Sequence, residues 1–318
     1  MTPFDVFQLL VFPGLLLLMV LAFFYEWIDR KFFARLQNRY GPLYTGPYGL
    51  FQPIADFIKL LAKEDIVPMA CDKLVFASTP ILYFALPLTA LFIVPISDST
   101  SLISFEGDLI FVMFVFTMLV ITVFLAGWSS ASRFGIIGGV RAALQMLSYE
   151  IPLGLAMVGP AIAAGSLSIS AIARWQSTNL VWSIFLQPIG FAVLIVGLLA
   201  ELEFVPFDIP EADTEIVAGW RTEFSGRKLA LFKVGRDLEL VLASAIAAAL
   251  YLGGAQALGP VPAIISFLIK TIAIVLLLSF LRAIFARFRI DQMTAGMWKY
   301  LLPIAIFQIV LIQFGIGR

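Results

Sequence analysis

The stretch Glu201-Leu-Glu-Phe-Val-Pro-Phe-Asp-Ile-Pro-Glu-Ala-Asp-Thr-Glu215 interrupts a chain that is otherwise dominated by long apolar segments. The wider region 200–239 carries 9 of the 21 acidic residues, although only 13% of the whole chain is charged. Carboxylates at the mouth of a membrane span are costly to desolvate, so they need partners, water or a function there. This region is therefore the first candidate for a functional site.

Seven of the nine acidic residues of this region fall into two groups. A solvated loop explains three of them equally well: Glu211, Asp213 and Glu223. By contrast, Glu201 directly follows an apolar run, and Asp237 and Glu239 open the next one. Together with Glu203 they are expected at the cytoplasmic ends of two neighbouring spans, where each carboxylate raises the proton affinity of the next. Such a cluster, with water, can hold and pass protons near neutral pH.

Composition places the chain among polytopic helical membrane proteins, because 61% of its residues are hydrophobic and its mean hydropathy is +0.99. A net charge of zero gives no indication of nucleic-acid binding. The single cysteine, Cys71, cannot hold an iron–sulfur cluster, which usually takes four thiolates. The absence of histidine excludes histidine-ligated haem, zinc and copper sites. We therefore expect this chain to bind no cofactor, and any redox chemistry must take place in other subunits.

The apolar segments predict an all-α fold, a bundle of eight membrane-spanning helices in a single integral-membrane domain over residues 1–318. The length of each segment is close to the roughly 20 residues that a membrane-spanning helix needs. The expected spans are Phe7–Phe24, Val75–Ile96, Leu109–Gly127, Arg141–Ala164, Trp182–Ala200, Leu238–Leu258, Ile264–Phe285 and Met297–Gly315. The residues 201–237 are expected to form an acidic loop.

Residues 50–63 predict an additional amphipathic helix. One face carries apolar side chains at helical spacing, among them Ile54 and Ile58, while Asp56, Lys59 and Lys63 fall on the other face. The segment is too short to span the bilayer, so it is expected to lie in the membrane plane or to pack under a partner.

The distribution of lysine and arginine predicts the orientation. The loops after spans one, three, five and seven carry nearly all of the basic residues, whereas the loops on the opposite side carry only Arg174. Because basic loops stay in the cytoplasm, both termini are expected outside, and the 201–237 loop is expected on the cytoplasmic side of the cell membrane.

Two ionisable residues are expected within the membrane. Glu150 lies in Ser148-Tyr-Glu-Ile-Pro152, where a proline can kink the helix and admit water beside the carboxylate. Arg141 lies two and a half turns earlier, on roughly the opposite helix face. Glu150 could carry protons, or it could pair with a basic neighbour and only fix helix packing. Lys270 could snorkel to the outer surface, or it could pair with a carboxylate as a buried cation.

Several ordered motifs resemble those of one known family. They include Arg35-Leu-Gln-Asn-Arg-Tyr-Gly-Pro42, Gly46-Pro-Tyr-Gly-Leu-Phe-Gln-Pro-Ile-Ala-Asp56, Arg141-Ala-Ala-Leu-Gln-Met-Leu-Ser-Tyr-Glu-Ile-Pro-Leu-Gly154 and Pro206-Phe-Asp-Ile-Pro-Glu-Ala-Asp-Thr-Glu215. Over about residues 25–315 the chain resembles the H subunit (subunit 1 in mitochondria) of respiratory complex I and the related subunit of energy-converting membrane hydrogenases and sulfur-reducing complexes.

The resemblance implies a membrane anchor and coupling subunit of a redox-driven ion pump, without a redox centre of its own. The implied partners are cytoplasmic iron–sulfur and hydrogenase-like subunits, antiporter-like membrane subunits and the lipid bilayer. The residues expected in ion pathway and coupling are Glu150, Glu201, Glu203, Glu211, Asp213, Glu215, Glu223, Asp237 and Glu239. Those expected in arm docking or charge compensation are Arg35, Arg39, Arg141 and Lys270.

Two departures from the family pattern bear on the electron acceptor. Quinone-reducing members usually have asparagine where this chain has Glu203 and arginine where it has Phe204. Losing an arginine and gaining a carboxylate favours the ferredoxin-dependent hydrogenase or sulfur-reductase branch, in which this subunit binds no quinone. A quinone site between the in-plane helix, span one and the acidic loop is the alternative. A stand-alone secondary transporter is a further alternative, but it leaves the long charged loops unexplained.

Overall fold

The computed structural model describes residues 3–98, 100–257 and 260–317, and all of its regular elements are helical. They are α1 (Pro3–Leu10), α2 (Leu15–Leu36), α3 (Gln52–Ala62), α4 (Lys73–Leu91), α5 (Asp108–Ser129), α6 (Arg133–Ala164), α7 (Ile169–Asn179), α8 (Ser183–Leu186), α9 (Pro188–Glu201), α10 (Asp213–Ile216), α11 (Gly226–Tyr251), α12 (Ala263–Ile284), α13 (Ile290–Gly296) and α14 (Leu302–Gln313). The predicted all-α class is confirmed.

Within the described residues, six helical segments are long and apolar enough to cross a membrane. They are Phe7–Leu36, Lys73–Leu91, Asp108–Ser129, Arg133–Ala164, Ala263–Ile284 and Ile290–Gln313. The two other predicted spans correspond to α9, an apolar helix of 14 residues, and α11, a helix of 26 residues whose first half is charged. The chain is therefore a polytopic membrane helix bundle.

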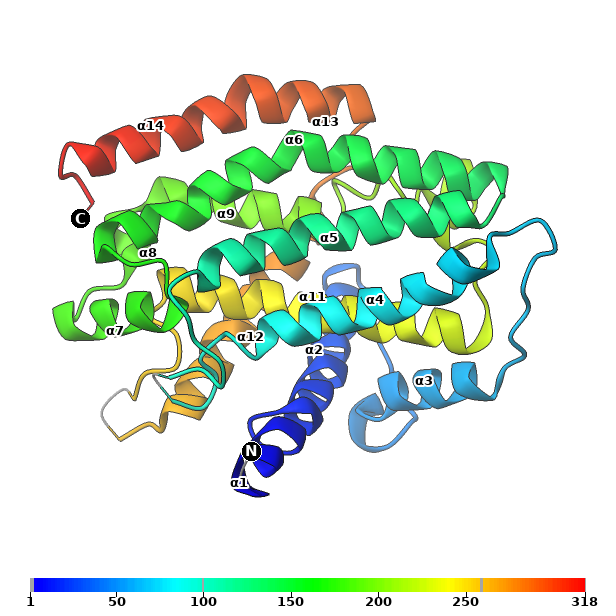
Figure 1. The fold of residues 1–318 in the computed structure, drawn as a ribbon, viewed down its shortest axis with the longest axis horizontal. Helices are drawn as coiled ribbons and strands as arrows, with labels where there is room; N and C mark the ends of the chain where they lie inside the picture. The colour runs from blue at the N-terminus through cyan, green and yellow to red at the C-terminus, as the bar shows by residue number, and fades with distance from the viewer. Residues whose placement is uncertain (1–2, 99, 258–259, 318) are drawn as a thin grey trace.

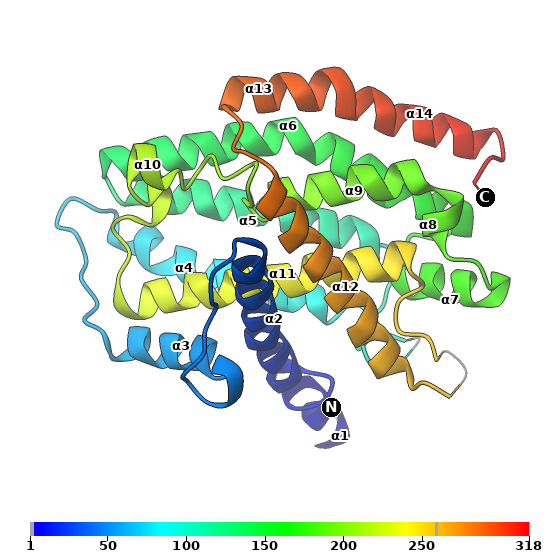
Figure 2. The ribbon, with the colours of Figure 1, turned by 180° about the vertical axis from the view of Figure 1, so that it is seen from behind.

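The helices form a layered bundle with two distinct ends (Figures 1 and 2). Helix α11 packs against α4 and α2, while α5 and α6 pack together and α6 contacts α9 and α14. Helices α2 and α12 pack against each other and against α11. Figure 2 shows α3 and α10 at one end of the bundle and α7 and α8 at the other.

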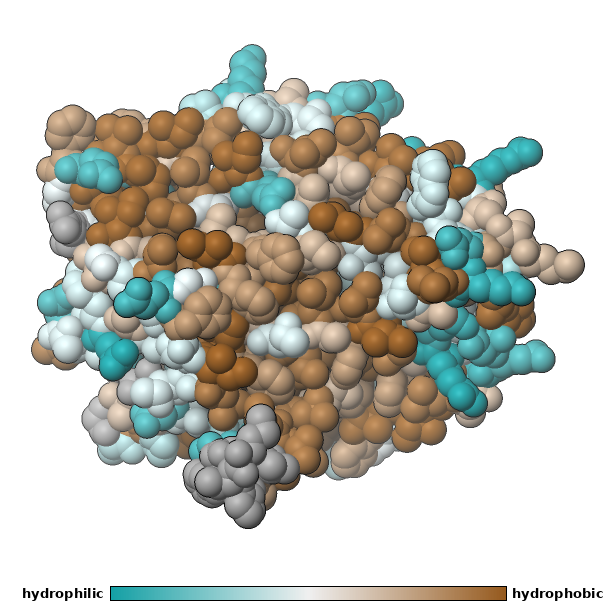
Figure 3. All heavy atoms as spheres, viewed as in Figure 1, coloured by the Kyte–Doolittle hydropathy of each residue, from teal (hydrophilic) through white to brown (hydrophobic). Residues whose placement is uncertain are grey.

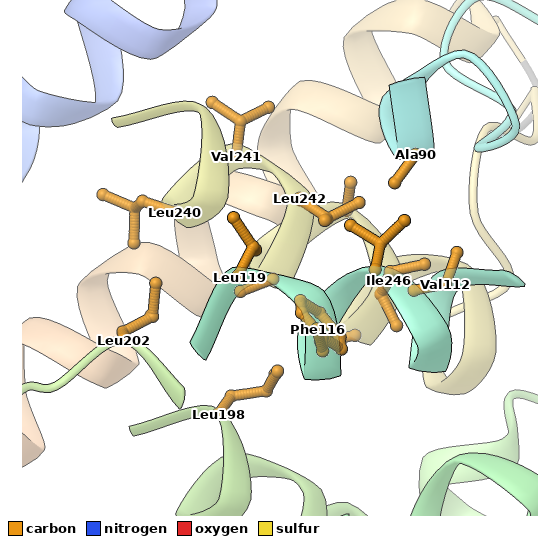
Figure 4. Packing of buried hydrophobic residues seen from close by; sticks show 14 of the residues in the cluster. Ala90, Val112, Phe116, Leu119, Leu198, Leu202, Leu240, Val241, Leu242 and Ile246 are labelled. Carbon is orange, nitrogen blue, oxygen red and sulfur yellow. The ribbon is translucent and has the colours of Figure 1, made fainter. Parts of the chain in front are cut away.

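The second half of α11 is the centre of the core. Every residue from Leu238 to Tyr251 is buried, and the many alanines in this stretch let neighbouring helices approach closely. Figure 4 shows Leu240, Leu242 and Ile246 facing side chains of α4, α5 and α9. This packing holds the charged first half of the same helix in a defined position.

The outer surface is apolar over a wide area. Hydrophobic residues cover most of the face seen in Figure 3, and hydrophilic residues gather near the end that carries α3. The exposed apolar side chains of the molecule include Phe114 and Ile121 of α5 and Leu147 and Ile151 of α6. An apolar surface of this extent is what lipid tails or neighbouring membrane helices cover.

Several predicted boundaries are wrong. Helix α2 continues to Leu36 rather than ending at residue 24, and α11 begins at Gly226 rather than at 238 and ends at Tyr251 rather than at 258. The acidic loop therefore ends at Ser225, not at residue 237. At the end of α2 and the beginning of α11 the physical reason is that the charges are paired within the bundle, so they do not mark the helix ends. Helix α11 stops early because Gly253 and Gly254, directly after it, adopt positive φ angles. A helix, α3, is present where the amphipathic segment 50–63 predicts one, and it is two residues shorter at its start and one at its end.

Candidate functional site

A charged cavity of about 320 Å³ lies between α2, the beginning of α11, the end of α12 and the loop that follows α9. Eleven of its fourteen lining residues are charged, and only Phe204, Val205 and Leu240 are apolar. The charged residues are Glu26, Asp29, Arg30, Glu203, Asp208, Glu211, Arg221, Lys233, Arg236, Asp237 and Arg282. We refer to this space as the acidic cavity, because its carboxylates outnumber its cations.

The loop 202–219 owes its course to backbone conformations that few residues adopt. Glu203 has φ +51° and Ala212 has φ +34°. Gly219 has φ +54°, and a Cβ atom there would lie 2.0 Å from the carbonyl oxygen of Pro210, so only glycine fits. Conformations of this kind persist where the surroundings determine them. Here the ion pairs made by Glu211 supply part of that determination.

Glu211 is the anchor of the loop. Arg236 Nη1 lies 2.7 Å from Glu211 Oε1, and Arg221 forms a second ion pair with the other carboxylate oxygen. Arg236 also donates to the carbonyl oxygen of Leu202 at 3.2 Å. Burial opposes ionisation of Glu211, but the two guanidinium groups outweigh it and hold its pKa below the ordinary range. Glu211 is therefore a fixed negative charge.

The pKa of Glu203 is shifted in the opposite direction to that of Glu211. Burial first, and then the charge of Glu211, raise the pKa of Glu203 to about 8, although Arg236 and Arg221 counteract the rise. The Trp220 indole nitrogen donates to its carboxylate at 3.4 Å. Glu203 and Glu211 also hydrogen-bond to each other, which requires a proton on one of them. Glu203 is thus the member of the pair that holds a proton near neutral pH.

Two carboxylates lie deeper in the bundle, each beside a tyrosine. Tyr149 Oη donates to Glu201 Oε2, and Tyr83 Oη donates to Glu239 Oε2, both at 2.7 Å. Both carboxylates are buried. Glu201 Oε1 has no hydrogen-bond partner among the described residues, so a proton on this carboxyl or a water beside it has to satisfy the atom. Glu201 also interacts electrostatically with Glu239 and with Glu203.

Glu150 continues this series towards α5. It accepts a hydrogen bond from Thr117 Oγ1 and is partly buried. A small cavity of about 10 Å³ is lined by both Glu150 and Glu201, together with Tyr149 and Thr117. That volume is close to what one water molecule needs. The carboxylates therefore form a row from the acidic cavity, through Glu201, to a helix face that neighbouring proteins or lipids can reach.

Sequence reasoning missed several residues of the site because they lie on α2, α12 and α3. Asp29 of α2 binds Arg282 of α12 with 2.9 Å between Oδ2 and Nη1, and Arg30 binds Asp56 of α3 at 2.9 Å. Glu26 hydrogen-bonds to Asp237, a second pair of carboxyl groups that must share a proton. The charged border 26–31 is visible in the sequence, but such a border is typical of a membrane interface and does not indicate which helices its charges contact.

Other predicted residues lie outside the cavity. Arg141 pairs with Glu215 at 2.7 Å at the bundle surface, where Arg287 also approaches the same carboxylate at 3.5 Å. The hydrogen bond from Arg141 and the charge of Arg287 lower the pKa of Glu215. Glu223 is partly buried and forms no ion pair with a described residue. The side chain of Asp213, which begins α10, lies outside the described part of the chain.

The basic residues predicted for arm docking or charge compensation do not lie together in the structure. Arg35 and Arg39 are exposed at the end of α2, where they face the rings of Tyr40 and Phe33. Lys270 lies on α12, beside the segment that follows α11 and away from the acidic cavity. Its ammonium group donates to the carbonyl oxygen of Gly254 at 2.9 Å and lies 5.2 Å from the ring centre of Trp182. No described carboxylate pairs with Lys270.

The described residues contain no group of three or more acidic, cysteine or histidine side chains arranged to hold a metal ion. The eleven charged side chains that line the acidic cavity would make burial of an apolar group there costly. The arrangement does suit proton chemistry. It combines fixed cations, a fixed anion at Glu211 and carboxyl groups that share protons.

A family model described as NADH dehydrogenase matches residues 8–313 of the chain. The H subunit of NADH-quinone oxidoreductase from Dehalococcoides mccartyi is 40% identical over 309 residues, which cover 97% of this chain and 86% of the relative. The protein of the same name from Thermomicrobium roseum is 39% identical over 92% of this chain and 90% of its own length. The second H subunit of Rhizobium meliloti is 38% identical over 96% and 95%. The chain therefore belongs to the complex I family of H subunits, also called subunit 1.

Proposed function

We propose that this chain is the membrane anchor and coupling subunit of a complex I-like ion pump, a single integral-membrane domain without a redox centre of its own. The observation that carries the proposal is the row of carboxyl groups from Glu203 and Glu211, through Glu239 and Glu201, to Glu150. The charged end of the bundle faces the cytoplasm, both termini lie outside, and the iron–sulfur subunits dock over the acidic cavity. Antiporter-like subunits lie against the membrane helices.

The coupling step is a proton shift driven by charge. A change of charge in the docked arm alters the field in the acidic cavity, where Glu203 holds a proton beside the fixed anion of Glu211. Arg236 and Arg221 keep Glu211 ionised while the proton moves. Glu239 and Glu201 receive it, with Tyr83 and Tyr149 orienting their carboxyl groups. Glu150 passes the proton or the field change to the neighbouring membrane subunits.

For the electron acceptor, the ferredoxin-dependent hydrogenase or sulfur-reductase branch is favoured. Its support is the charged lining of the cavity, including Glu203, and the place of Phe204 within that lining. In this branch the acidic cavity holds water and protons, and no quinone enters it. The pumped ion is a proton or a sodium ion.

A quinone-reducing complex is the second candidate, and a separate observation favours it. The relatives from Dehalococcoides mccartyi, Thermomicrobium roseum and Rhizobium meliloti are all named for NADH-quinone oxidoreductase. In that case only the polar headgroup of the quinone would contact the acidic cavity. Glu203 and Phe204 would then be sequence variations that quinone binding tolerates.

An acceptor assay on the intact complex from native membranes separates the two candidates. We expect oxidation of reduced ferredoxin with hydrogen or sulfide as product, and no reduction of a soluble quinone by a suitable donor. Robust quinone reduction would contradict the favoured branch and leave the coupling role in place. Turnover without any ion movement in proteoliposomes would contradict the coupling role itself.

A further inference from the structure

Two buried oxygen atoms need a hydrogen-bond donor where α6 packs against α9. They are Gln145 Oε1 on α6 and Glu201 Oε1 at the end of α9, and neither has a hydrogen-bond partner among the described residues. Gln145 is 1% exposed and Glu201 is 4% exposed. Because a buried polar atom without a partner is costly, two such acceptors at one helix contact point to a donor that serves both.

The other end of the Gln145 amide is fixed. Gln145 Nε2 donates to the carbonyl oxygen of Ala200 at 2.8 Å, and the same carbonyl accepts from the amide nitrogen of Glu203 at 3.3 Å. A flipped amide would set its oxygen against that carbonyl oxygen, so Gln145 Oε1 has to remain the free acceptor. The side chain therefore ties α6 to the last turn of α9, which is the turn that carries Glu201.

The carboxyl group of Glu201 is oriented by the same face of α6. Tyr149 lies one turn after Gln145 and donates to Glu201 Oε2 at 2.7 Å, which leaves Oε1 as the other oxygen of the group. The neighbouring carboxylates Glu239 and Glu150 oppose a negative charge on Glu201. A proton on Oε1 removes that repulsion, and it also supplies the donor that the Gln145 oxygen lacks.

We propose that Gln145 is a positioning residue for the proton of Glu201: its nitrogen fixes the last turn of α9, and its oxygen accepts the hydrogen bond that protonated Glu201 donates from Oε1. One proton thereby satisfies both oxygens. Loss of the proton leaves Gln145 Oε1 without a donor, so the amide favours the protonated form of Glu201 until a neighbouring carboxylate takes the proton. The proposal deepens the proposed function, on which it rests for the role of Glu201 in proton transfer.

Gln176 offers a matched control. It is also fully buried, and its Nε2 donates to the carbonyl oxygen of Ala249 at the end of α11, as Gln145 does at the end of α9. Its Oε1, however, accepts from the amide nitrogen of Ser183 at 3.1 Å. Methionine has a similar length without the amide. Gln176→Met and Gln145→Met therefore remove the same kind of contact to a helix end, and only Gln145→Met removes a partner of Glu201.

Infrared spectroscopy of the whole purified complex tests the proposal without turnover. The carbonyl stretch of protonated Glu201 is the band that Glu201→Gln removes and that deuterium exchange displaces, and we expect it in the unmodified complex at neutral pH. In Gln145→Met this band should move to higher frequency, because a carboxyl group that donates no hydrogen bond has a stiffer C=O bond. In Gln176→Met it should stay in place. Gln145→Asn is one methylene too short to make both contacts, and it serves if the methionine variant fails to assemble.

The number of ions moved per electron is measured in proteoliposomes that contain the same variants. Gln145→Met should reduce this number by about tenfold, the scale of one net hydrogen bond. Gln176→Met should leave it unchanged, because its helix contact lies away from the carboxyl groups.

Three infrared results would overturn the proposal. They are no Glu201 band at neutral pH, a band that Gln145→Met does not move, and an equal displacement in Gln176→Met. A loss of transport in Gln145→Met without a displaced band would likewise refute the role of Gln145 and leave the proposed function standing. A displaced band with unchanged transport would do the reverse, since Gln145 would still position the proton of Glu201 while the row of carboxyl groups would have no coupling role.

Discussion

Buried polar groups have different kinds of hydrogen-bond partner at the two ends of the bundle. At the end of α7 and α8, two buried polar side chains have structural partners: Gln176 donates to the carbonyl oxygens of Ala249 and Leu250, and Asp108 accepts from Ser168 Oγ at 3.1 Å and from a backbone amide. At the cavity end, carboxyl groups contact other carboxyl groups, as Glu203 and Glu211 do. The first arrangement stabilises helix ends, whereas the second stores protons, so the two ends should respond differently to the same chemical change.

The largest expected effect on transport is at Glu201. Glu201→Gln keeps the shape and the hydrogen bond from Tyr149 but cannot release a proton, so ion transport should fall on the order of 100-fold, the scale of a lost proton-transfer group. The matched variant Asp108→Asn should lower stability and leave the number of ions moved per electron unchanged. Ion transport and electron transfer are measured together in proteoliposomes that contain each variant. Equal losses of transport in the two variants would show that the two ends of the bundle do not differ in their role.

The largest expected effect on stability is at Arg236. Arg236→Met leaves the buried carboxylate of Glu211 with Arg221 alone, and removing one partner of a buried pair costs about 3 kcal/mol. Arg227→Met removes an exposed cation from the same helix and should change the free energy of unfolding by less than about 0.5 kcal/mol. Thermal unfolding of the purified complex measures both, and a similar small change in the two variants would show that Glu211 is not held by Arg236.

The pH dependence of stability reports the protonation state of Glu203. Its pKa in the folded protein is about 8, against an ordinary value of 4.5, so between these pH values the folded protein keeps a proton that the unfolded chain releases. The contribution of Glu203 to stability is therefore full below pH 4.5 and is lost as the pH rises through 8. Glu203→Gln cannot ionise and should flatten the fall in thermal stability across this range. An unchanged slope would mean that Glu203 is ionised at neutral pH.

The smallest expected effect is at Glu215. Its carboxylate is exposed and pairs with Arg141 at the surface, so Glu215→Gln should change stability by about 1 kcal/mol or less. Because the pKa of Glu215 is lowered, this small contribution should vanish at acidic pH, where the carboxylate is protonated. Chemical denaturation at neutral and acidic pH checks both statements, and a transport loss comparable with that of Glu201→Gln would place Glu215 on the pathway.

Much of the fold was predictable because apolar segments of spanning length are unambiguous, and six of the eight appear as long apolar helices. The end of α2 and the beginning of α11 were not predictable from hydropathy. Glu26 hydrogen-bonds to Asp237 across the two helices and Arg30 pairs with Asp56 of α3, so these charges can remain inside helices. In the site, Glu201, Glu203 and Glu239 were found because they flank apolar runs. Arg282 and Asp29 were not assigned to the site, because only the tertiary fold brings α12 next to α2.

The most direct test of the coupling role is to measure the number of ions that the Glu150→Gln complex moves per electron in proteoliposomes. Glu150 is where the row of carboxyl groups reaches the edge of the subunit, so the account predicts an assembled complex that transfers electrons and moves markedly fewer ions. Unchanged ion transport per electron would contradict the coupling role of the row, and Glu150 would then serve only to fix the packing of α6 against α5.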